Sequence, residues 1–131
     1  MMKNLTILII EDEQVTAQLI QKMLENLGYH IAGIITSGEE ALASIGTIKP
    51  DLIIMDITLA GKIDGIEAAS FINKHFGIPI IYLTANTNFE IIQRAKDETT
   101  SYGYLLKPVK GIDLHWTINT ALKRHHFEKS E

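Results

Sequence analysis

The chain has 131 residues, 46% of them hydrophobic, and a formal charge of −4, which excludes intrinsic disorder and predicts one globular domain. It contains no cysteine, which excludes disulfides and thiolate metal sites and suits a reducing cytosol. No apolar run approaches the ~20 residues that span a bilayer, and the mild acidity argues weakly against bulk nucleic-acid binding. We therefore expect a cytoplasmic single domain over residues 1–131, with its core at about 4–124 and a short charged tail, without direct nucleic-acid contact or membrane insertion.

Apolar runs alternate along the chain with segments of helical spacing. The runs are short, rich in isoleucine and mostly continuous rather than alternating, which is typical of strands covered on both faces of a parallel sheet. Their repetition predicts a doubly wound α/β domain, and we expect a five-stranded parallel sheet in the flavodoxin-like order 2-1-3-4-5, with helices on both faces. The runs are residues 5–10, 30–36, 51–55, 78–84 and 102–106.

The segment after the first run carries an apolar stripe and ends at Gly28, a natural helix stop. Two later helices are predicted to begin at capping boxes, Ser37–Glu40 and Thr87–Glu90, while Asp64 with Glu67 is a weaker start signal. The apolar stripe of the first helix consists of Val15, Leu19, Met23 and Leu27, widened by Ile20 and Leu24.

The last predicted helix leads into the charged end of the chain. Trp116 lies on this helix, and the sequence leaves open whether it joins the core or a dimer or partner surface. His125 and His126 are adjacent, so on a helix they face different directions and make a poor metal pair; a solvated helix end is expected instead. The apolar stripe of this helix is Leu114, Ile118, Ala121 and Leu122.

Polar residues follow four of the five predicted strands directly. In an open parallel sheet, ligands bind beyond the carboxyl ends of the strands, at the point where the strand order reverses. With the order 2-1-3-4-5, the first and third strands flank that point, so the acids that follow them should converge on one crevice. The residues are Glu11, Asp12 and Glu13 after the first run, Asp56 after the third, Thr84 and Asn86 after the fourth and Lys107 after the fifth.

These residue types suit a metal and a phosphoryl group. Carboxylates gathered at one point repel each other unless a cation joins them, and an all-oxygen set with waters and a phosphate is how Mg²⁺ is usually held. Lys107 would supply a point charge for a phosphoryl oxygen, and Thr84 would donate its hydroxyl to another.

Each residue also has a simpler interpretation. Asp12 could cap the first helix, Thr84 could satisfy its own backbone, and Lys107 could be a surface cation before a turn. The acids after strands one and three, the hydroxyl after strand four and the Lys-Pro after strand five occur together, and this coincidence favours a functional site.

The chain resembles the response-regulator receiver domain over essentially its whole length. The matching segments are ILIIEDE, KPDLIIMDI, IIYLTA and YGYLLKP. The resemblance implies that Asp56 is the phosphoacceptor, that Thr84 and Lys107 contact the phosphoryl group, and that Tyr104 is an aromatic switch, for which a half-buried strand residue with a solvated hydroxyl is the alternative.

The same resemblance implies a metal site and a signalling role. Asp12, Asp56 and the backbone carbonyl of Thr58 would hold Mg²⁺, Glu11 would assist through a water, and the Lys-Pro peptide would be cis. The implied partners are a histidine kinase or phosphotransfer protein that donates a phosphohistidine, and a downstream protein on the face of helix 4, strand 5 and helix 5, with a homodimer left open. The domain would catalyse its own phosphorylation and dephosphorylation rather than act as a conventional enzyme.

Two segments depart from the common family pattern. Ala60 stands where a proline is usual, and the loop before Asp64-Gly65 carries one extra residue. The segment AKDETTSYGY also differs from the usual turn, and both variants resemble a subgroup of stand-alone receivers associated with sensor kinases. Thr58 and Asn86 sit at positions that in the family tune water access to the acyl phosphate.

Three other functions compete with the receiver interpretation. A haloacid-dehalogenase-like phosphatase would place its nucleophile after the first strand with a second Asp two residues on, whereas residue 58 is Thr. A nucleotide-binding module would need a Gly-rich loop at the first helix, where the sequence is EDEQ. A receiver that acts only by docking, without phosphorylation, is the third alternative.

Overall fold

The computed structural model describes residues 5–85 and 89–129, and it contains the predicted alternation of strands and helices. The apolar runs become strands, with bounds that differ from the predicted ones by one or two residues. The elements in chain order are β1 (Thr6–Ile10), α1 (Gln14–Asn26), β2 (His30–Ile35), α2 (Gly38–Ile48), β3 (Leu52–Asp56), α3 (Gly65–His75), β4 (Ile80–Thr84), α4 (Phe89–Glu98), β5 (Gly103–Leu106) and α5 (Gly111–Lys129).

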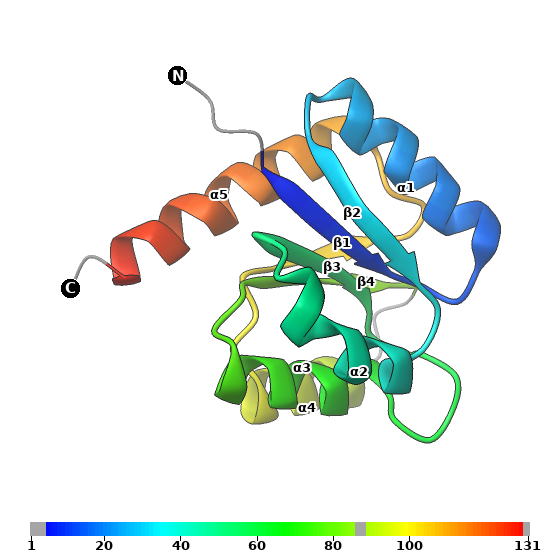
Figure 1. The fold of residues 1–131 in the computed structure, drawn as a ribbon, viewed down its shortest axis with the longest axis vertical. Coiled ribbons are helices and arrows are strands. Elements are labelled where there is room, and N and C mark those ends of the chain that lie inside the picture. Colours follow the sequence, from blue (N-terminus) through cyan, green and yellow to red (C-terminus); the bar gives the residue numbers. More distant parts are fainter. Residues whose placement is uncertain (1–4, 86–88, 130–131) are drawn as a thin grey trace.

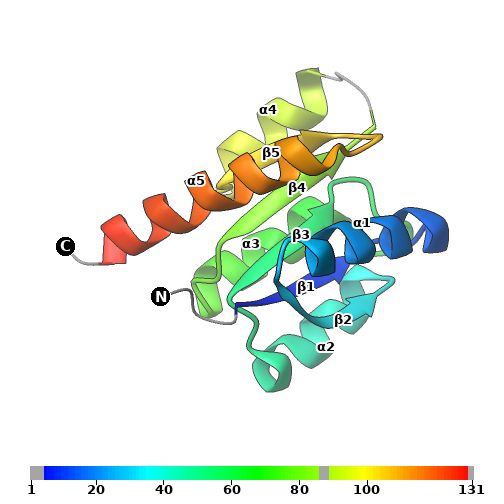
Figure 2. The ribbon, with the colours of Figure 1, turned by 90° about the horizontal axis from the view of Figure 1, so that it is seen from above.

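The strands form one parallel sheet in the order β2-β1-β3-β4-β5, which confirms the predicted topology. Figure 2 shows the strands side by side in this order, with β2 and β5 at the two edges. β1 and β3 are neighbours in the centre, with Ile10 opposite Met55 in register. The strand order reverses between them, so their carboxyl ends flank the expected binding crevice.

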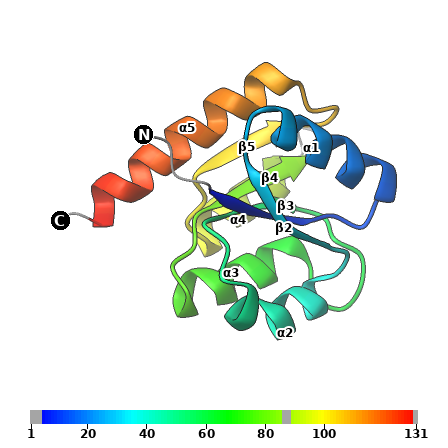
Figure 3. The ribbon, with the colours of Figure 1, turned by 45° about the horizontal axis from the view of Figure 1, so that its top comes forward.

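Helices cover both faces of the sheet, as predicted. α1 and α5 lie on one face, and α2, α3 and α4 lie on the other (Figures 1 and 3). Alternate residues of each strand point to opposite faces, so in β1 Ile7 and Ile9 pack under α1 and α5, whereas Leu8 and Ile10 pack against α2 and α3. All residues of β3 are buried, because this central strand is covered on both sides.

The buried face of α1 differs from the predicted stripe. Ala17, Ile20 and Leu24 are buried against the sheet, whereas Val15 and Leu19 are 71% and 56% exposed. A spacing of four residues drifts around a helix of 3.6 residues per turn, so one straight stripe cannot follow the surface of the sheet. The residues expected only to widen the stripe therefore form its centre.

The capping motif predicted to be the weaker one is the complete one in the structure. Asp64 and Glu67 form a complete reciprocal capping box at the start of α3. At α2 only half of the motif is present, since the Ser37 side chain accepts the backbone N–H of Glu40 at 3.1 Å. The third predicted box, Thr87–Glu90, begins outside the described residues.

α5 buries Leu114, Ile118 and Ala121 as predicted, and its far end reaches beyond the edge of the sheet in Figure 1. Trp116 is 61% exposed, which places it on the surface rather than in the core. The helix continues through the charged segment to Lys129, and Arg124 there lies over the Tyr102 ring at 4.5 Å from its centre. The domain bounds expected from the sequence stay a prediction.

None of the helices within residues 5–85 and 89–129 combines the length and the hydropathy that crossing a bilayer requires.

Candidate functional site

The sheet brings the first and third strand ends together. Glu11 follows β1 directly, and its backbone N–H continues the ladder to β2 by donating to Ile35 O at 2.9 Å. Asp56 is the last residue of β3, opposite Leu83 of β4. Because both backbones stay hydrogen-bonded to the last residue, the sheet itself aims these side chains into the crevice beyond its carboxyl edge.

Three carboxylates meet there, as expected from the sequence. One ligand oxygen from each of Glu11, Asp12 and Asp56 lies within 4.8 Å of the other two. Glu11 is fully buried and Asp56 is 4% exposed, whereas Asp12 faces solvent. The set offers only oxygen ligands and one open side, which fits a hard divalent cation that keeps several waters, such as Mg²⁺.

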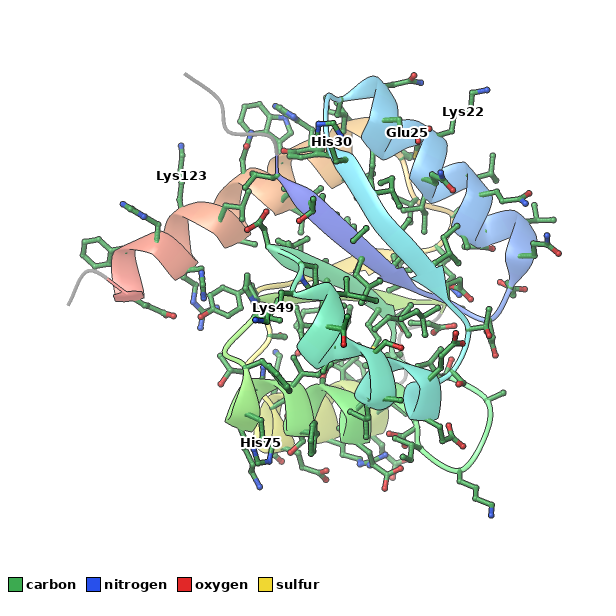
Figure 4. All side chains as sticks on the ribbon, in the orientation of Figure 1. Lys22, Glu25, His30, Lys49, His75 and Lys123 are labelled. Carbon is green, nitrogen blue, oxygen red and sulfur yellow. The ribbon has the colours of Figure 1, made fainter. Side chains whose placement is uncertain are left out.

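Two histidines at the ends of elements, His30 and His75, do not join this group. His30 begins β2 and His75 ends α3, so both lie at the amino edge of the sheet, opposite to the acids. Figure 4 shows these two exposed side chains on opposite sides of the molecule. Imidazole ligands, which would favour zinc, copper or nickel, are therefore absent from the described acidic cluster.

Lys107 supplies the positive charge of the site. Its Nζ lies 2.8 Å from Glu11 Oε1, 3.2 Å from Asp56 Oδ2 and 3.6 Å from Glu13 Oε1. The side chain is 15% exposed, so the interpretation of Lys107 as a surface cation is wrong. Its peptide bond to Pro108 is cis, as the family resemblance implied.

Burial and charge shift the pKa values of Glu11 and Lys107. Desolvation raises the pKa of Glu11 to about 7, although the hydrogen-bonding ammonium of Lys107 opposes the shift. Desolvation alone would lower the pKa of Lys107, but the carboxylates of Glu11 and Asp56 outweigh it and hold that pKa above its usual range. Lys107 is therefore charged at neutral pH, whereas Glu11 is close to its midpoint.

The loop after β3 holds the other acids. The backbone N–H and the hydroxyl of Thr58 donate to Asp56 Oδ1 at 3.0 and 3.2 Å. The backbone N–H of Ala60 donates to Asp12 Oδ2 at 3.2 Å. The N-cap of α1 is Glu13, which makes no side-chain capping bond, so Asp12 is not the helix cap that the sequence allowed.

Thr84 and Asn86 are the residues predicted at the end of the fourth strand. Thr84 is the last residue of β4, is 3% exposed and pairs with Leu106 of β5. Its carbonyl accepts the backbone N–H of Lys107 at 2.8 Å, so the tips of β4 and β5 are held side by side. Asn86 lies outside the described residues.

Tyr104 lies on β5 directly opposite Tyr82 of β4. The two rings stack with centres 5.7 Å apart, and the Tyr82 hydroxyl is 2.9 Å from Thr99 Oγ1 at the end of α4. The Tyr104 hydroxyl is buried and has no hydrogen-bond partner among the described residues. The alternative of a solvated hydroxyl is therefore wrong, while the switch role stays a prediction.

Sequence reasoning missed the residues that fix the loop from outside. Glu39 at the start of α2 accepts a backbone N–H from Lys62 at 3.2 Å. Arg94 of α4 binds Asp64 Oδ2 at 2.7 Å. These contacts join residues 23 and 30 positions apart, so no local pattern could have signalled them.

The family model described as the response regulator receiver domain matches residues 7–119. The chain belongs to this family. This receiver domain is similar to the receiver of a modulated diguanylate cyclase from Desulfovibrio desulfuricans, with a TM-score of 0.90 and 36% identity over 96% of this chain and 99% of that one. Family membership favours the receiver interpretation over the phosphatase and the nucleotide module.

Curated relatives of this receiver are longer proteins. The transcriptional regulatory protein PdtaR of Mycobacterium tuberculosis is 38% identical over 90% of this chain and 57% of its own length. The transcriptional regulatory protein YvrH of Bacillus subtilis is 31% identical over 98% of this chain and 53% of its own length. The chain thus spans about half the length of these relatives.

Proposed function

We propose that this receiver accepts a phosphoryl group on Asp56 from the phosphohistidine of a histidine kinase or phosphotransfer protein. The observation that carries the proposal is the position of Asp56, which is 4% exposed, held by Thr58 and 3.2 Å from the Lys107 ammonium. A buried carboxylate beside a cation and two further acids is arranged for a reaction with a highly charged partner rather than for stability. Phosphoryl transfer needs mainly this positioning and charge stabilisation.

The acids fit Mg²⁺, which Asp12, Asp56 and the Thr58 carbonyl would hold as the family implies, with Glu11 assisting through a water. When bound, the metal would neutralise charge on the transferring phosphoryl oxygens. Asp12 is the exposed member, so it can turn from the Ala60 N–H towards a cation without unpacking the core.

The transfer itself would use the carboxylate and the ammonium. A carboxylate oxygen of Asp56 attacks phosphorus, the bond from phosphorus to the donor imidazole nitrogen breaks, and an acyl phosphate forms. Lys107 would exchange its carboxylate partner for a phosphoryl oxygen, and Thr84 would donate its hydroxyl to another oxygen. The same residues would serve the later hydrolysis, so the domain acts on itself and is not a conventional enzyme.

A groove beside Lys107 supports the approach of a partner protein. It has a volume of about 330 Å³ and lies between α1 and the segment after β5. Leu19 and Met23 line one side, and Pro108 and Val109 line the other. Apolar walls next to a charged reaction centre suit a helix that presents a phosphohistidine at its surface.

The signal would leave through the face of α4, β5 and α5. A dianionic phosphoryl group would favour conformations that bring Thr84 closer, and Tyr104, one strand away, would respond to the space that this frees. Leu106 on β5 is 57% exposed and Phe89 on α4 is 83% exposed, so this face offers apolar contact area to a downstream protein or a second copy. We propose a cytoplasmic location for this exchange.

A direct test is incubation of the domain with Mg²⁺ and acetyl phosphate, followed by intact mass. Wild type should gain one phosphoryl group, and Asp56→Asn should gain none, because an amide oxygen is a poor nucleophile. A fluoroberyllate mimic should shift the fluorescence of the exposed Trp116 in wild type only. An unlabelled wild type would favour the alternative of a receiver that docks without phosphorylation, and labelling of Asp56→Asn would overturn the assignment.

A further inference from the structure

The loop between β3 and α3, residues 57–64, is tied to elements on both sides of it. Ala60 N–H binds Asp12 after β1, Lys62 N–H binds Glu39 of α2, and Asp64 binds Arg94 of α4. In Figure 1 this loop passes the start of α2 before it returns to α3. The extra residue that distinguishes the chain from the common receiver pattern thus belongs to a segment that is held at several points.

Glu39 is the residue of α2 that contacts the loop. Its Oε2 accepts the Lys62 N–H at 3.2 Å, and its own N–H, the Lys62 N–H and the Ile63 N–H together lower the pKa of the carboxyl group. The carboxylate is therefore ionised at neutral pH and faces the loop backbone, although the residue itself is exposed.

The loop backbone is shaped to receive this carboxylate. Gly61 has a φ of +105°, and a Cβ there would lie 3.2 and 3.3 Å from the two carboxylate oxygens of Glu39. At the next contact, a Cβ on Gly38 would lie 2.6 Å from Ile63 O. Two glycines thus allow the loop and the first turn of α2 to approach closely. An incidental surface contact would not require glycine at both positions.

The same short stretch of backbone reaches the acidic cluster. Thr58 binds Asp56, Ala60 binds Asp12, and Lys62 binds Glu39, so alternate residues of 58–62 are each fixed to one carboxylate. Only Glu39 lies outside the acidic cluster. If Asp12 turned from the Ala60 N–H towards a cation, the contact of Lys62 with Glu39 would still hold the loop at its outer end.

We propose that Glu39 is a positioning residue of the metal site, which fixes the Gly61–Ile63 backbone and so presents Thr58 and Ala60 to the acids that hold Mg²⁺. This inference rests on the proposed metal site and deepens it. It assigns a role to the lengthened loop, which becomes long enough to reach the carboxylate on α2. Groups that orient metal ligands from outside the ligand set commonly change metal affinity when they are removed.

The test compares three variants of the full chain by Mg²⁺ affinity, measured from NMR shifts of the Asp56 region or by competition with Mn²⁺. Glu39→Ala should weaken binding about 3- to 10-fold, below the ~10- to 100-fold seen for direct partners of metal ligands. Glu39→Gln keeps an acceptor oxygen for Lys62 N–H but loses the charge, so it should recover most of the affinity. Glu40→Ala removes the same charge from the same helix turn, and it should bind as wild type does.

The outcomes separate the possible failures. A wild type that binds no Mg²⁺ overturns the metal site itself and this inference with it, whereas normal affinity in Glu39→Ala overturns only the role of Glu39. Equal weakening in Glu39→Gln and Glu40→Ala would mean that net charge, not positioning, sets the affinity. If Glu39→Ala does not fold, Gly61→Ala tests the same contact, because its Cβ would press on the carboxylate; unchanged affinity there would also count against the inference.

Discussion

At the residue scale, the acidic cluster depends on one ammonium group. Lys107 Nζ contacts Glu11 at 2.8 Å and Asp56 at 3.2 Å, in a place where neither carboxylate can reach bulk water freely. Glu11 is fully buried, so its contact with the Lys107 ammonium is the main compensation for its charge. The ammonium of Lys107 thus balances the charges of these carboxylates only in part.

Glu11 makes the stability of the metal-free protein depend on pH. Its pKa is about 7 in the folded protein, against the ordinary value of 4.5 that holds in the unfolded chain. Between these pH values the folded form therefore binds a proton that the unfolded form has lost. The free energy of unfolding should therefore fall as pH rises from about 4.5 to about 7. Urea titrations across this range should show the decline.

The control for this prediction is Glu11→Gln, in which the slope should flatten because the titrating group is gone. Mg²⁺ at saturating concentration should flatten it too, since a divalent charge favours the ionised carboxylate. A slope that persists in the variant would assign the effect to other groups.

Removal of Lys107 should separate metal binding from switching. Lys107→Ala leaves Glu11 and Asp56 without their cation, and we expect the free energy of unfolding to fall by ~1–3 kcal/mol. This is less than the ~3–5 kcal/mol that breaking a buried ion pair commonly costs, because Glu11 can take up a proton. The variant should still bind Mg²⁺ but should lose the change in partner affinity that a phosphodonor causes. Urea denaturation and a binding titration check the two effects; an unchanged response to phosphodonor would argue against the role of Lys107.

At the scale of elements, the start of α3 is packed directly against the end of β3. A Cβ on Gly65, the first residue of α3, would collide with the backbone oxygen of Asp56 and lie 3.0 Å from Ile57 Cα. The Asp64 capping box fixes the same turn, so the helix cannot move away to make room. Asp56 is therefore held by the helix behind it as well as by the sheet.

This packing predicts a contrast between two similar substitutions. Gly65→Ala should destabilise the fold by ~1–3 kcal/mol through overpacking. Gly111→Ala also replaces the first residue of a helix, but nothing lies within 4 Å of the new Cβ, so its effect should stay within about 0.5 kcal/mol. Thermal or urea unfolding of both variants tests this, and equal effects would show that the contact with Asp56 is not the cause.

At the scale of the whole molecule, the residues that stabilise the fold and the candidate site residues lie in different places. Two apolar clusters, one on each face of the sheet, stabilise the strands, and the helices that cover them leave the carboxyl edge open. Four candidate site residues stand at that edge, on backbones fixed by parallel pairing: Glu11, Asp56, Thr84 and Lys107. The loop from β3 to α3 then connects the edge to α2 and α4, which lie on the same face (Figure 3).

The amino-acid sequence by itself determined the alternation of strands and helices and the residues at the strand ends, because buried parallel strands and their polar ends leave a pattern that is local in the chain. Asp56 and Lys107 could be named in this way, since each directly follows an apolar run. The buried face of α1 and the exposure of Trp116 were decided by the tertiary structure, because they depend on how a helix rotates against the sheet. The contacts of Glu39 and Arg94 with the loop after β3 were decided there as well, since they join residues far apart in sequence through single side chains and leave no periodic signal.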